Sequence, residues 1–247
     1  MRNIFKRSYV RCLVGACLVL SAGSLFADDV KPFVDDNRIS FTGATATYIG
    51  SELVLTYLDP ETAGTLKINS GLKAEVEILA VGGGGAGGTI GKDTTTLGGG
   101  GGGAGGLILL EDAEKVALAG GDYTIKVGAG GAAATENTNS TPGTNGGDTT
   151  ISTANGALYT AKGGGGGGAE SDGQDGGSGG GGGAKNYAAG TAVDSAYGND
   201  GGAGKVFTGG AGGGGAGGAG GNAVLMGGAG GAGISTDILR REKRDRR

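Results

Sequence analysis

The chain contains no histidine, no tryptophan and only two cysteines. Without imidazole it lacks the side chain that most often acts as a general base near neutral pH and as a ligand for transition metals. Both cysteines, Cys12 and Cys17, lie near the N-terminus, so the rest of the chain has neither a disulfide nor a thiolate for a metal or a reaction. Backbone pairing and a modest apolar core must therefore stabilise the fold.

Proline and positive charge are also scarce. The only prolines are Pro32, Pro60 and Pro142, which excludes a collagen triple helix with its abundant proline and glycine at every third position. The formal net charge is −4, so an acidic body is an unlikely match for nucleic acid, and we expect no such partner. The exception is the arginine-rich end at 240–247, which is either a site for anionic surfaces, a solvated end or a reading-frame artefact.

The first 27 residues have the layout of a secretory signal peptide. Four basic residues precede an apolar run at 12–20 and a stretch of small residues at 21–27, and we expect cleavage after Ala27. The run is too short to span a bilayer core, which needs about 20 residues, so no stable membrane span is expected in the mature chain. Val-Gly-Ala-Cys at 14–17 also resembles a lipoprotein box, but the apolar region before it is short.

Glycine is present in great excess, and all but six of the 64 glycines lie between Gly82 and Gly233. Ordering each backbone residue costs roughly 1–2 kcal/mol, and glycine side chains offer no burial in return. The tracts must either remain disordered or dock against one another through backbone hydrogen bonds worth about 1 kcal/mol each. Short apolar runs recur between the tracts, which favours the ordered alternative.

These runs predict an all-β fold, an antiparallel β-sandwich-like framework with glycine-rich segments. Only 111–117 has a composition suited to a helix. We expect a signal peptide at 1–27, an N-terminal arm at 28–44, one glycine-rich β domain at 45–239 and a basic tail at 240–247. The expected strands are 39–41, 45–49, 52–57, 65–68, 75–81, 107–110, 116–118, 123–127, 149–153, 158–160, 205–208 and 223–226.

Alanine spacing suggests a conformation for the tracts. Ala216 and Ala219 are three residues apart, as are Ala229 and Ala232, and three residues per turn is the repeat of the polyproline II helix. Packed polyglycine II helices would bond only to their neighbours, with alanine on an outward edge. Random glycine–alanine drift would give the same spacing.

Several motifs in order resemble the glycine-rich domains of bacteria and phages. They are Ile-Leu-Ala-Val-Gly-Gly-Gly-Gly at 78–85, a tract closing in Gly-Gly-Leu at 105–107, Tyr-Thr-Ile-Lys-Val-Gly-Ala-Gly-Gly at 123–131, Gly-Gly-Asp-Thr at 146–149 and a long tract at 162–169. The resemblance covers 45–238 and implies polyglycine II helices joined to a β-sandwich, with loops used for recognition. Such domains usually continue beyond the segment that ends at Ile238, whereas here the basic tail follows.

The same resemblance extends distantly to the extracellular glycine-rich region of anaplastic-lymphoma-type receptor tyrosine kinases. The chain has none of the kinase motifs, which need a lysine strand, a His-Arg-Asp loop and Asp-Phe-Gly. No Gly-x-x-x-x-Gly-Lys-Ser/Thr phosphate loop is present either. We therefore expect no enzymatic activity and no cofactor, with an extracellular carbohydrate-active enzyme as a remote alternative.

Side chains return in the insertions between tracts, where contact surfaces are usually found. The carboxylates of Asp172, Asp175, Asp194 and Asp200 could ligate calcium, although their spacing matches no calcium loop and solvated carboxylates are the preferred interpretation. The insertion at 184–200 combines tyrosines with polar groups, and its candidate recognition residues are Lys185, Asn186, Tyr187, Asp194, Tyr197, Asn199 and Asp200.

Two functions remain open. One is a secreted or cell-surface structural and adhesion module that binds a surface glycan or protein, and the other is a matrix-like protein that associates with itself. In both, close packing of tracts requires glycine at particular positions. The candidate structural glycines are Gly82, Gly83, Gly84, Gly85 and Gly166.

Overall fold

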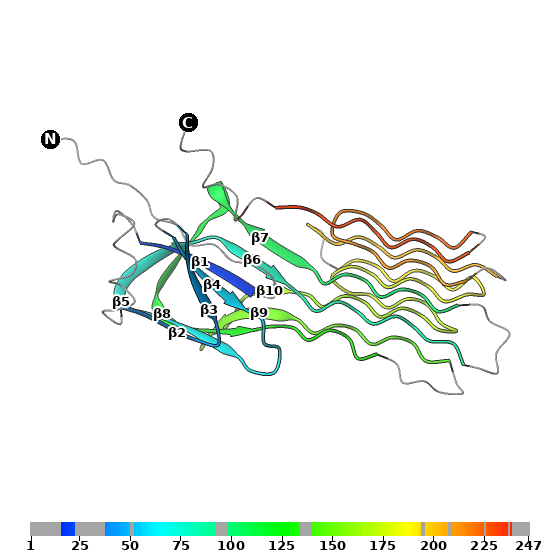
Figure 1. Ribbon diagram of the computed structural model, residues 1–247, viewed down its shortest axis with the longest axis horizontal. Coiled ribbons are helices and arrows are strands. Elements are labelled where there is room, and N and C mark those ends of the chain that lie inside the picture. The colour runs from blue at the N-terminus through cyan, green and yellow to red at the C-terminus, as the bar shows by residue number, and fades with distance from the viewer. Residues whose placement is uncertain are drawn as a thin grey trace.

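The computed structural model of the chain describes residues 16–22, 38–49, 52–91, 98–133, 140–193, 196–206, 209–224, 226–236 and 238. These residues form two connected parts, a β-sandwich and a bundle of glycine tracts that runs away from it (Figure 1). Strands of the sandwich continue directly into tracts, so one polypeptide passes between the two parts repeatedly.

The first sheet has the order β3–β4–β1–β6–β7, and all of its neighbouring strands are antiparallel. Its strands are β1 (Ala16–Ala22), β3 (Thr45–Ile49), β4 (Glu52–Tyr57), β6 (Ile78–Val81) and β7 (Leu107–Leu110). The predicted strands at 45–49, 52–57 and 107–110 have exactly these bounds. The predicted strand at 75–81 is interrupted at Glu77, because β6 begins only at Ile78.

The second sheet has the order β2–β5–β8–β9–β10 and is also antiparallel. Its strands are β2 (Ile39–Thr42), β5 (Gly64–Val76), β8 (Val116–Lys126), β9 (Thr149–Thr153) and β10 (Gly156–Ala161). The end of β1 joins the two sheets, since Ser21 and Ala22 pair with Glu75 and Ala74 of β5. The predicted all-β class is confirmed.

The core lies between the sheets and explains their sequence patterns. In β5 the side chains alternate, so that Leu66 and Ile68 are buried while Thr65 and Lys67 face solvent. The internal strand β4 instead buries consecutive apolar residues, from Leu53 to Leu55. Ile238 is fully buried in the same core, so the last glycine tract brings the chain back to the sandwich.

A charged pair is also enclosed near the start of β6. The carboxylate of Glu77 is buried, and its Oε1 lies 3.0 Å from Nζ of Lys115, which precedes β8. Removing one member of such a buried pair is costly because the other charge remains in a low-dielectric site. This pair ties the connection between β5 and β6 to the opposite sheet.

Several sequence expectations differ from the structure. The apolar run assigned to the leader contributes β1, and β2 places part of the predicted arm at 28–44 inside the second sheet. The predicted strand at 65–68 and the first two residues of 75–81 belong to the longer β5, and the strands at 116–118 and 123–127 fall in β8, which ends at Lys126. The pairing of β5 with β8 continues across an irregularity after Ile68. The helix-friendly 111–117 gives only a single 3₁₀ turn, η1 (Asp112–Glu114).

The predicted strands at 205–208 and 223–226 are wrong for the residues that the structure describes, which are 205, 206, 223, 224 and 226. In the described residues of both segments the backbone forms turns or bends at the ends of glycine tracts, with one isolated bridge between Lys205 and Gly209. The described parts of both segments lie at the end of the bundle away from the sandwich, and no described strand lies beside them to pair with (Figure 1). The apolar residues of these segments have the local pattern of a strand, but they do not form one because they lack a neighbouring strand to pair with.

Candidate functional site

The glycine tracts form a bundle held by backbone hydrogen bonds. Tract 82–91 donates to tract 98–106 from Gly82, Gly85 and Gly88, each with an N···O distance of 2.9 Å. The donors are three residues apart, and so are the acceptors. An antiparallel pair of tracts therefore repeats its contacts every third residue rather than every second residue, as a β-strand would.

The residues between these donors bond to a different neighbour. Gly83, Ala86 and Thr89 donate to tract 140–148, again with N···O distances of 2.9 Å. Carbonyl oxygens of tract 82–91 also accept hydrogen bonds from a third neighbouring tract, in which Gly164 and Gly167 are the donors. Tract 82–91 is thus cross-linked to several neighbours at once, which a planar sheet does not allow.

This packing leaves no room for side chains at most tract positions. A Cβ at Gly82 would contact the carbonyl of Lys162, one at Gly83 that of Ala129 and one at Gly85 that of Gly165, all closer than van der Waals distance. Gly166 is equally confined, against Gly143. Among the predicted structural glycines Gly84 differs, because its Cβ would lie an ordinary 3.8 Å from the nearest atom, the oxygen of Gly103.

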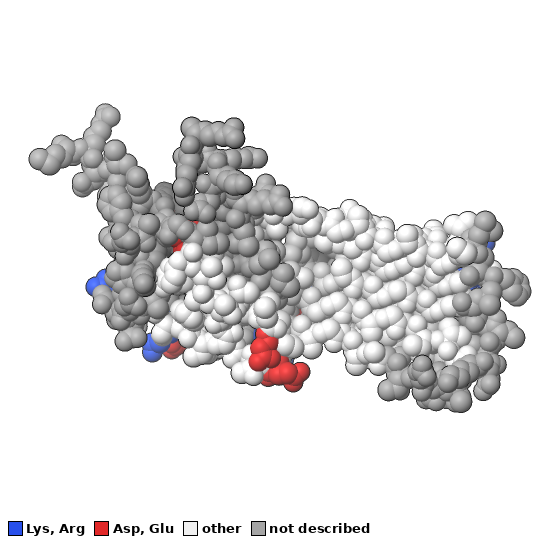
Figure 2. All heavy atoms as spheres, viewed as in Figure 1, with Lys and Arg blue, Asp and Glu red and all other residues white. Residues whose placement is uncertain are grey.

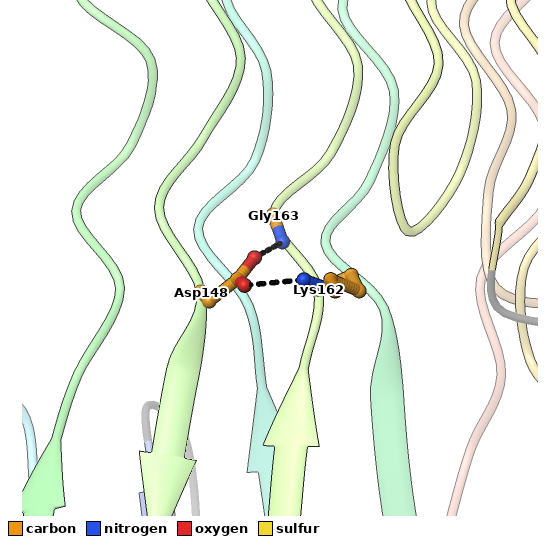
Figure 3. Close-up of polar contacts among 3 residues, drawn as sticks. All are labelled: Asp148, Lys162 and Gly163. Atoms are coloured by element: carbon orange, nitrogen blue, oxygen red, sulfur yellow. Dashed lines mark hydrogen bonds and ion pairs between the residues drawn. The ribbon is translucent and has the colours of Figure 1, made fainter. Parts of the chain in front are cut away.

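The junction between sandwich and bundle is fixed by the Gly-Gly-Asp-Thr motif at 146–149. Asp148 Oδ1 accepts the N–H of Gly163 at 2.9 Å, and its Oδ2 lies 2.7 Å from Nζ of Lys162 (Figure 3). Burial alone would raise the pKa of Asp148, but the hydrogen bonds from Lys162 and Gly163 and the charge of Lys162 lower it overall. The carboxylate therefore joins the tract before β9 to the tract after β10.

Thr149 extends this clamp to two more junctions. Its hydroxyl is buried, donates to the carbonyl oxygen of Val81 at 2.6 Å and accepts the N–H of Gly128 at 2.8 Å. Val81 ends β6, and Gly128 begins the tract after β8. Together Asp148, Thr149 and Lys162 connect four strand-to-tract junctions, and we call these three residues the junction clamp.

The predicted recognition insertion does not form one surface. Lys185, Asn186 and Tyr187 make a turn at the end of the bundle away from the sandwich, next to the turns near 170 and 206. Tyr197 instead packs against the sandwich core. The intervening residues run along the bundle as tract 188–193, so the two tyrosines lie at opposite ends of it. Asp194 is outside the described residues.

The turn at 185–187 is rigidly held. Lys185 and Asn186 both have positive φ angles, 73° and 65°, which are uncommon for residues other than glycine. Nζ of Lys185 lies 2.7 Å from Oε1 of Glu170, and Asn186 Oδ1 accepts the N–H of Val206 at 3.2 Å. With the turns near 170, 206 and 224–226, these residues define what we call the distal end.

The described carboxylates that were considered as calcium ligands accept hydrogen bonds from the backbone. Oδ1 of Asp172 accepts the N–H of Ala188, Oδ1 of Asp175 that of Thr191, and Oδ1 of Asp200 that of Ala192. The hydrogen bonds from the backbone and hydroxyl of Thr191 lower the pKa of Asp175. Within the described residues no cluster of three or more potential ligands could hold a metal ion.

Asn199 is likewise engaged inside the bundle, where its side-chain amide donates to the carbonyl oxygen of Gly215 at 2.7 Å. Near it, at the sandwich end, Tyr197 lines a cavity of about 660 Å³ together with β7, Lys162 and Val193. This cavity borders the junction clamp through Lys162, and the predicted recognition residue Tyr197 is part of its lining. Its lining mixes aliphatic side chains with two charged ones, Glu114 and Lys162.

Charge and apolar exposure differ along the molecule. On the face drawn in Figure 2, the visible charged side chains lie on the sandwich and at the distal end, while the tracts between them carry none. The distal end also exposes Val224 and Met226, the latter with 77% of its surface accessible. On this face, charged side chains are therefore concentrated at the two ends of the bundle.

Sequence reasoning located the tracts but missed the junction clamp. The signal was the motif itself, because an acidic residue and a threonine that interrupt pure glycine immediately before a strand need partners. Ala27 and the basic tail at 240–247 are outside the described residues. In the part of the chain that the structure describes, no helix has the length and apolar character to cross a membrane.

Comparison with known proteins gives one match. A family profile described as a glycine-rich domain matches residues 60–239, which is more than half of the chain and includes the junction clamp, most of the sandwich and the whole bundle. Searches of curated proteins and of solved structures found no significant match. The chain belongs to the glycine-rich domain family.

Proposed function

We propose that this protein is a non-enzymatic, secreted or cell-surface structural and adhesion module, in which the bundle holds recognition residues away from the sandwich. The tracts act as polyglycine II helices, and the leader is removed after Ala27 on export. Recognition takes place at the distal end, with a surface glycan or protein as the ligand. No cofactor is needed for this role.

The three-residue spacing of the hydrogen bonds carries the proposal. A helix with three residues per turn and a rise of about 3.1 Å points successive N–H groups in different directions, as the donors of tract 82–91 do. Over the nine residue-to-residue steps from 98 to 107 this rise gives a length of about 28 Å. A bundle of that length, cross-linked in several directions, is a stiff spacer.

The distal end has suitable chemistry for recognition. Tyr187 is half-buried beside the ion pair of Lys185 and Glu170, and the turn that carries it is fixed by backbone and side-chain hydrogen bonds. A preorganised turn with an aromatic ring and both charges binds a glycan or protein surface at little entropic cost. Exposed Val224 and Met226 add apolar area at the same end.

The test is surface binding by two tyrosine variants. Purified protein is applied to immobilised cell-surface extract and to a glycan array, and Tyr187→Ala is compared with Tyr48→Ala, which removes an exposed tyrosine from β3 on the sandwich. Binding should be lost in Tyr187→Ala and kept in Tyr48→Ala. Equal binding by both variants would contradict recognition at the distal end.

A second function, self-association as a matrix-like protein, is favoured by the outermost tract. Among the described residues no heavy atom lies within 4 Å of the position that a Cβ would take at Gly230 or Gly233, so this side of tract 227–236 is open to another tract. Light scattering over a wide concentration range decides this. A constant monomer mass would exclude self-association, and a rising mass would support it.

A further inference from the structure

The middle strand of the first sheet comes from the segment that the proposed export would remove. β1 lies between β4 and β6 and pairs with both of them. Its register with β4 runs from Ala16↔Tyr57 to Leu20↔Leu53, and its register with β6 runs from Ala16↔Ala80 to Leu18↔Ile78. β1 is therefore an internal strand, and removing it would leave a gap between two strands rather than shorten an edge.

The gap would be difficult for the sandwich to close. β4 and β6 both run antiparallel to β1, so they are parallel to each other and about 10 Å apart, twice the usual strand spacing. Their facing N–H and C=O groups would lose their partners, which is costly in a buried site. The strands are held in place by Leu53, Leu55 and Ile78, which are fully buried in the core.

The chemistry of the gap defines what can fill it. The facing positions, 53–57 of β4 and 78–80 of β6, contain no charged residue, and the present occupant has the sequence Ala-Cys-Leu-Val-Leu-Ser-Ala. The remaining segments that are not part of either sheet or bundle are a poor match. Residues 28–37 contain five charges and a proline, and 239–247 is almost entirely charged.

We propose that the gap between β4 and β6, which we call the acceptor slot, binds an extended, uncharged, apolar strand of a partner polypeptide once the leader has been removed. The added strand would run antiparallel to both neighbours, as β1 does, and would restore their hydrogen bonds by strand addition. This inference rests on the proposed export, because an uncleaved leader fills the acceptor slot from within the same chain.

The first experiment opens the acceptor slot after folding. A protease recognition site is inserted between Ala27 and Asp28 of the full chain, the folded protein is cut, and a synthetic peptide of the sequence Ala16–Ala22 with flanking lysines is added as the probe. We expect saturable exchange of the leader fragment for the peptide at one peptide per chain, measured by native mass spectrometry.

Two peptide variants provide a matched control. Leu18→Lys introduces a charge, and Leu18→Ile keeps an apolar residue, at the position that pairs with Leu55 of β4 and Ile78 of β6, which are both fully buried. Leu18→Lys should therefore exchange about tenfold or more weakly than Leu18→Ile, because a buried ammonium without a partner is costly. Equal exchange by both variants would mean that the peptide does not lie in the acceptor slot.

A cross-link checks the register in the intact chain. The register places Cys17 opposite Thr56 of β4, so Thr56→Cys should form a disulfide with Cys17 on mild oxidation when Cys12 is replaced by serine. Thr47→Cys on β3, which does not neighbour β1, is the control and should remain reduced. A cross-link in the control but not in Thr56→Cys would overturn the assignment of β1 to this position.

Failure of the inference can be told apart from failure of the proposed function. If the cut protein refuses the peptide and keeps its melting temperature, or dimerises through the gap instead, the acceptor slot is refuted even if the protein is exported. N-terminal sequencing of protein from the cell surface tests export separately. A chain that still begins before Ala16 would contradict the removal of the leader while leaving peptide exchange intact.

Discussion

Replacing Gly166 by alanine should destabilise the protein strongly, although it adds only one methyl group. A Cβ at this position would meet the carbonyl oxygen of Gly143 and lie 2.6 Å from its carbonyl carbon, whereas carbon atoms normally approach to about 3.5–4.0 Å. Both atoms belong to the backbone of the neighbouring tract 140–148. No side chain can turn away, so that tract must shift by roughly 1 Å relative to its neighbour.

The cost follows from the hydrogen bonds that this shift would disturb. Three bonds join the two tracts here: Gly143 N–H to Gly167 O at 2.8 Å, Gly146 N–H to Gly164 O at 2.9 Å, and Gly166 N–H to Asn145 Oδ1 at 2.7 Å. At about 1 kcal/mol each, their loss lowers the free energy of unfolding by about 2–4 kcal/mol. For a chain of this size that corresponds to a fall in melting temperature of about 5–15 °C.

Thermal unfolding followed by circular dichroism measures this shift, with Gly230→Ala as the control. Among the described residues nothing lies within 4 Å of a Cβ at Gly230, and alanine there restricts the unfolded chain. The control should therefore melt at the same temperature or slightly higher. If Gly166→Ala melts together with Gly230→Ala, the tracts are not packed as the structure shows.

Three further predictions concern the junction clamp and the core. Thr149→Val should lower the free energy of unfolding by about 2–3 kcal/mol, because Gly128 N–H and Val81 C=O lose their shared hydrogen-bond partner. Thr149→Ser keeps the hydroxyl and should lose less stability, and urea unfolding of the two variants measures the difference. The lowered pKa of Asp148 stabilises the folded state above the ordinary aspartate pKa of about 4, and this contribution is lost as the pH falls through the lower folded value. Asp148→Asn should therefore lose less stability than wild type between about pH 5 and pH 2, and an identical pH dependence would refute the assignment. Burial raises the pKa of Tyr57, so stability is present below the ordinary value of about 10 and is lost as the pH rises above it. Tyr57→Phe should reduce this alkaline loss in pH-jump unfolding, and an unchanged profile would argue against it.

Local patterns in the sequence were sufficient to predict most of the sandwich. Strands such as 52–57 and 149–153 have strong β-propensity and clear glycine or proline boundaries, and their bounds are correct. The error at 223–226 has the opposite cause, because an apolar run becomes a strand only if a neighbour is available to pair with it. The sequence predictions divided each of the long strands β5 and β8 into two shorter strands, near Asn69 and Gly120. The local sequence does not show that pairing continues across an irregularity, because the partner strand decides this.

The candidate site was less predictable. The insertion at 184–200 is continuous in sequence, but the tract within it separates Tyr187 from Tyr197, and the length of a tract cannot be recognised while its partners are unknown. The junction clamp depends on a contact between Thr149 and Val81, which are 68 residues apart in the sequence. The apolar run of a leader and the apolar strand of a sandwich have the same composition, so only tertiary pairing distinguishes β1 from a segment without a place in the fold.

The central claim is that the backbones of the glycine tracts satisfy one another and hold the bundle together. Amide hydrogen exchange measured residue by residue in native buffer tests it directly. Slow exchange is predicted at donors inside the bundle, such as Gly103, Gly167 and Gly181, with fast exchange at the exposed residues of the distal end. Fast exchange throughout 82–233 would contradict the claim.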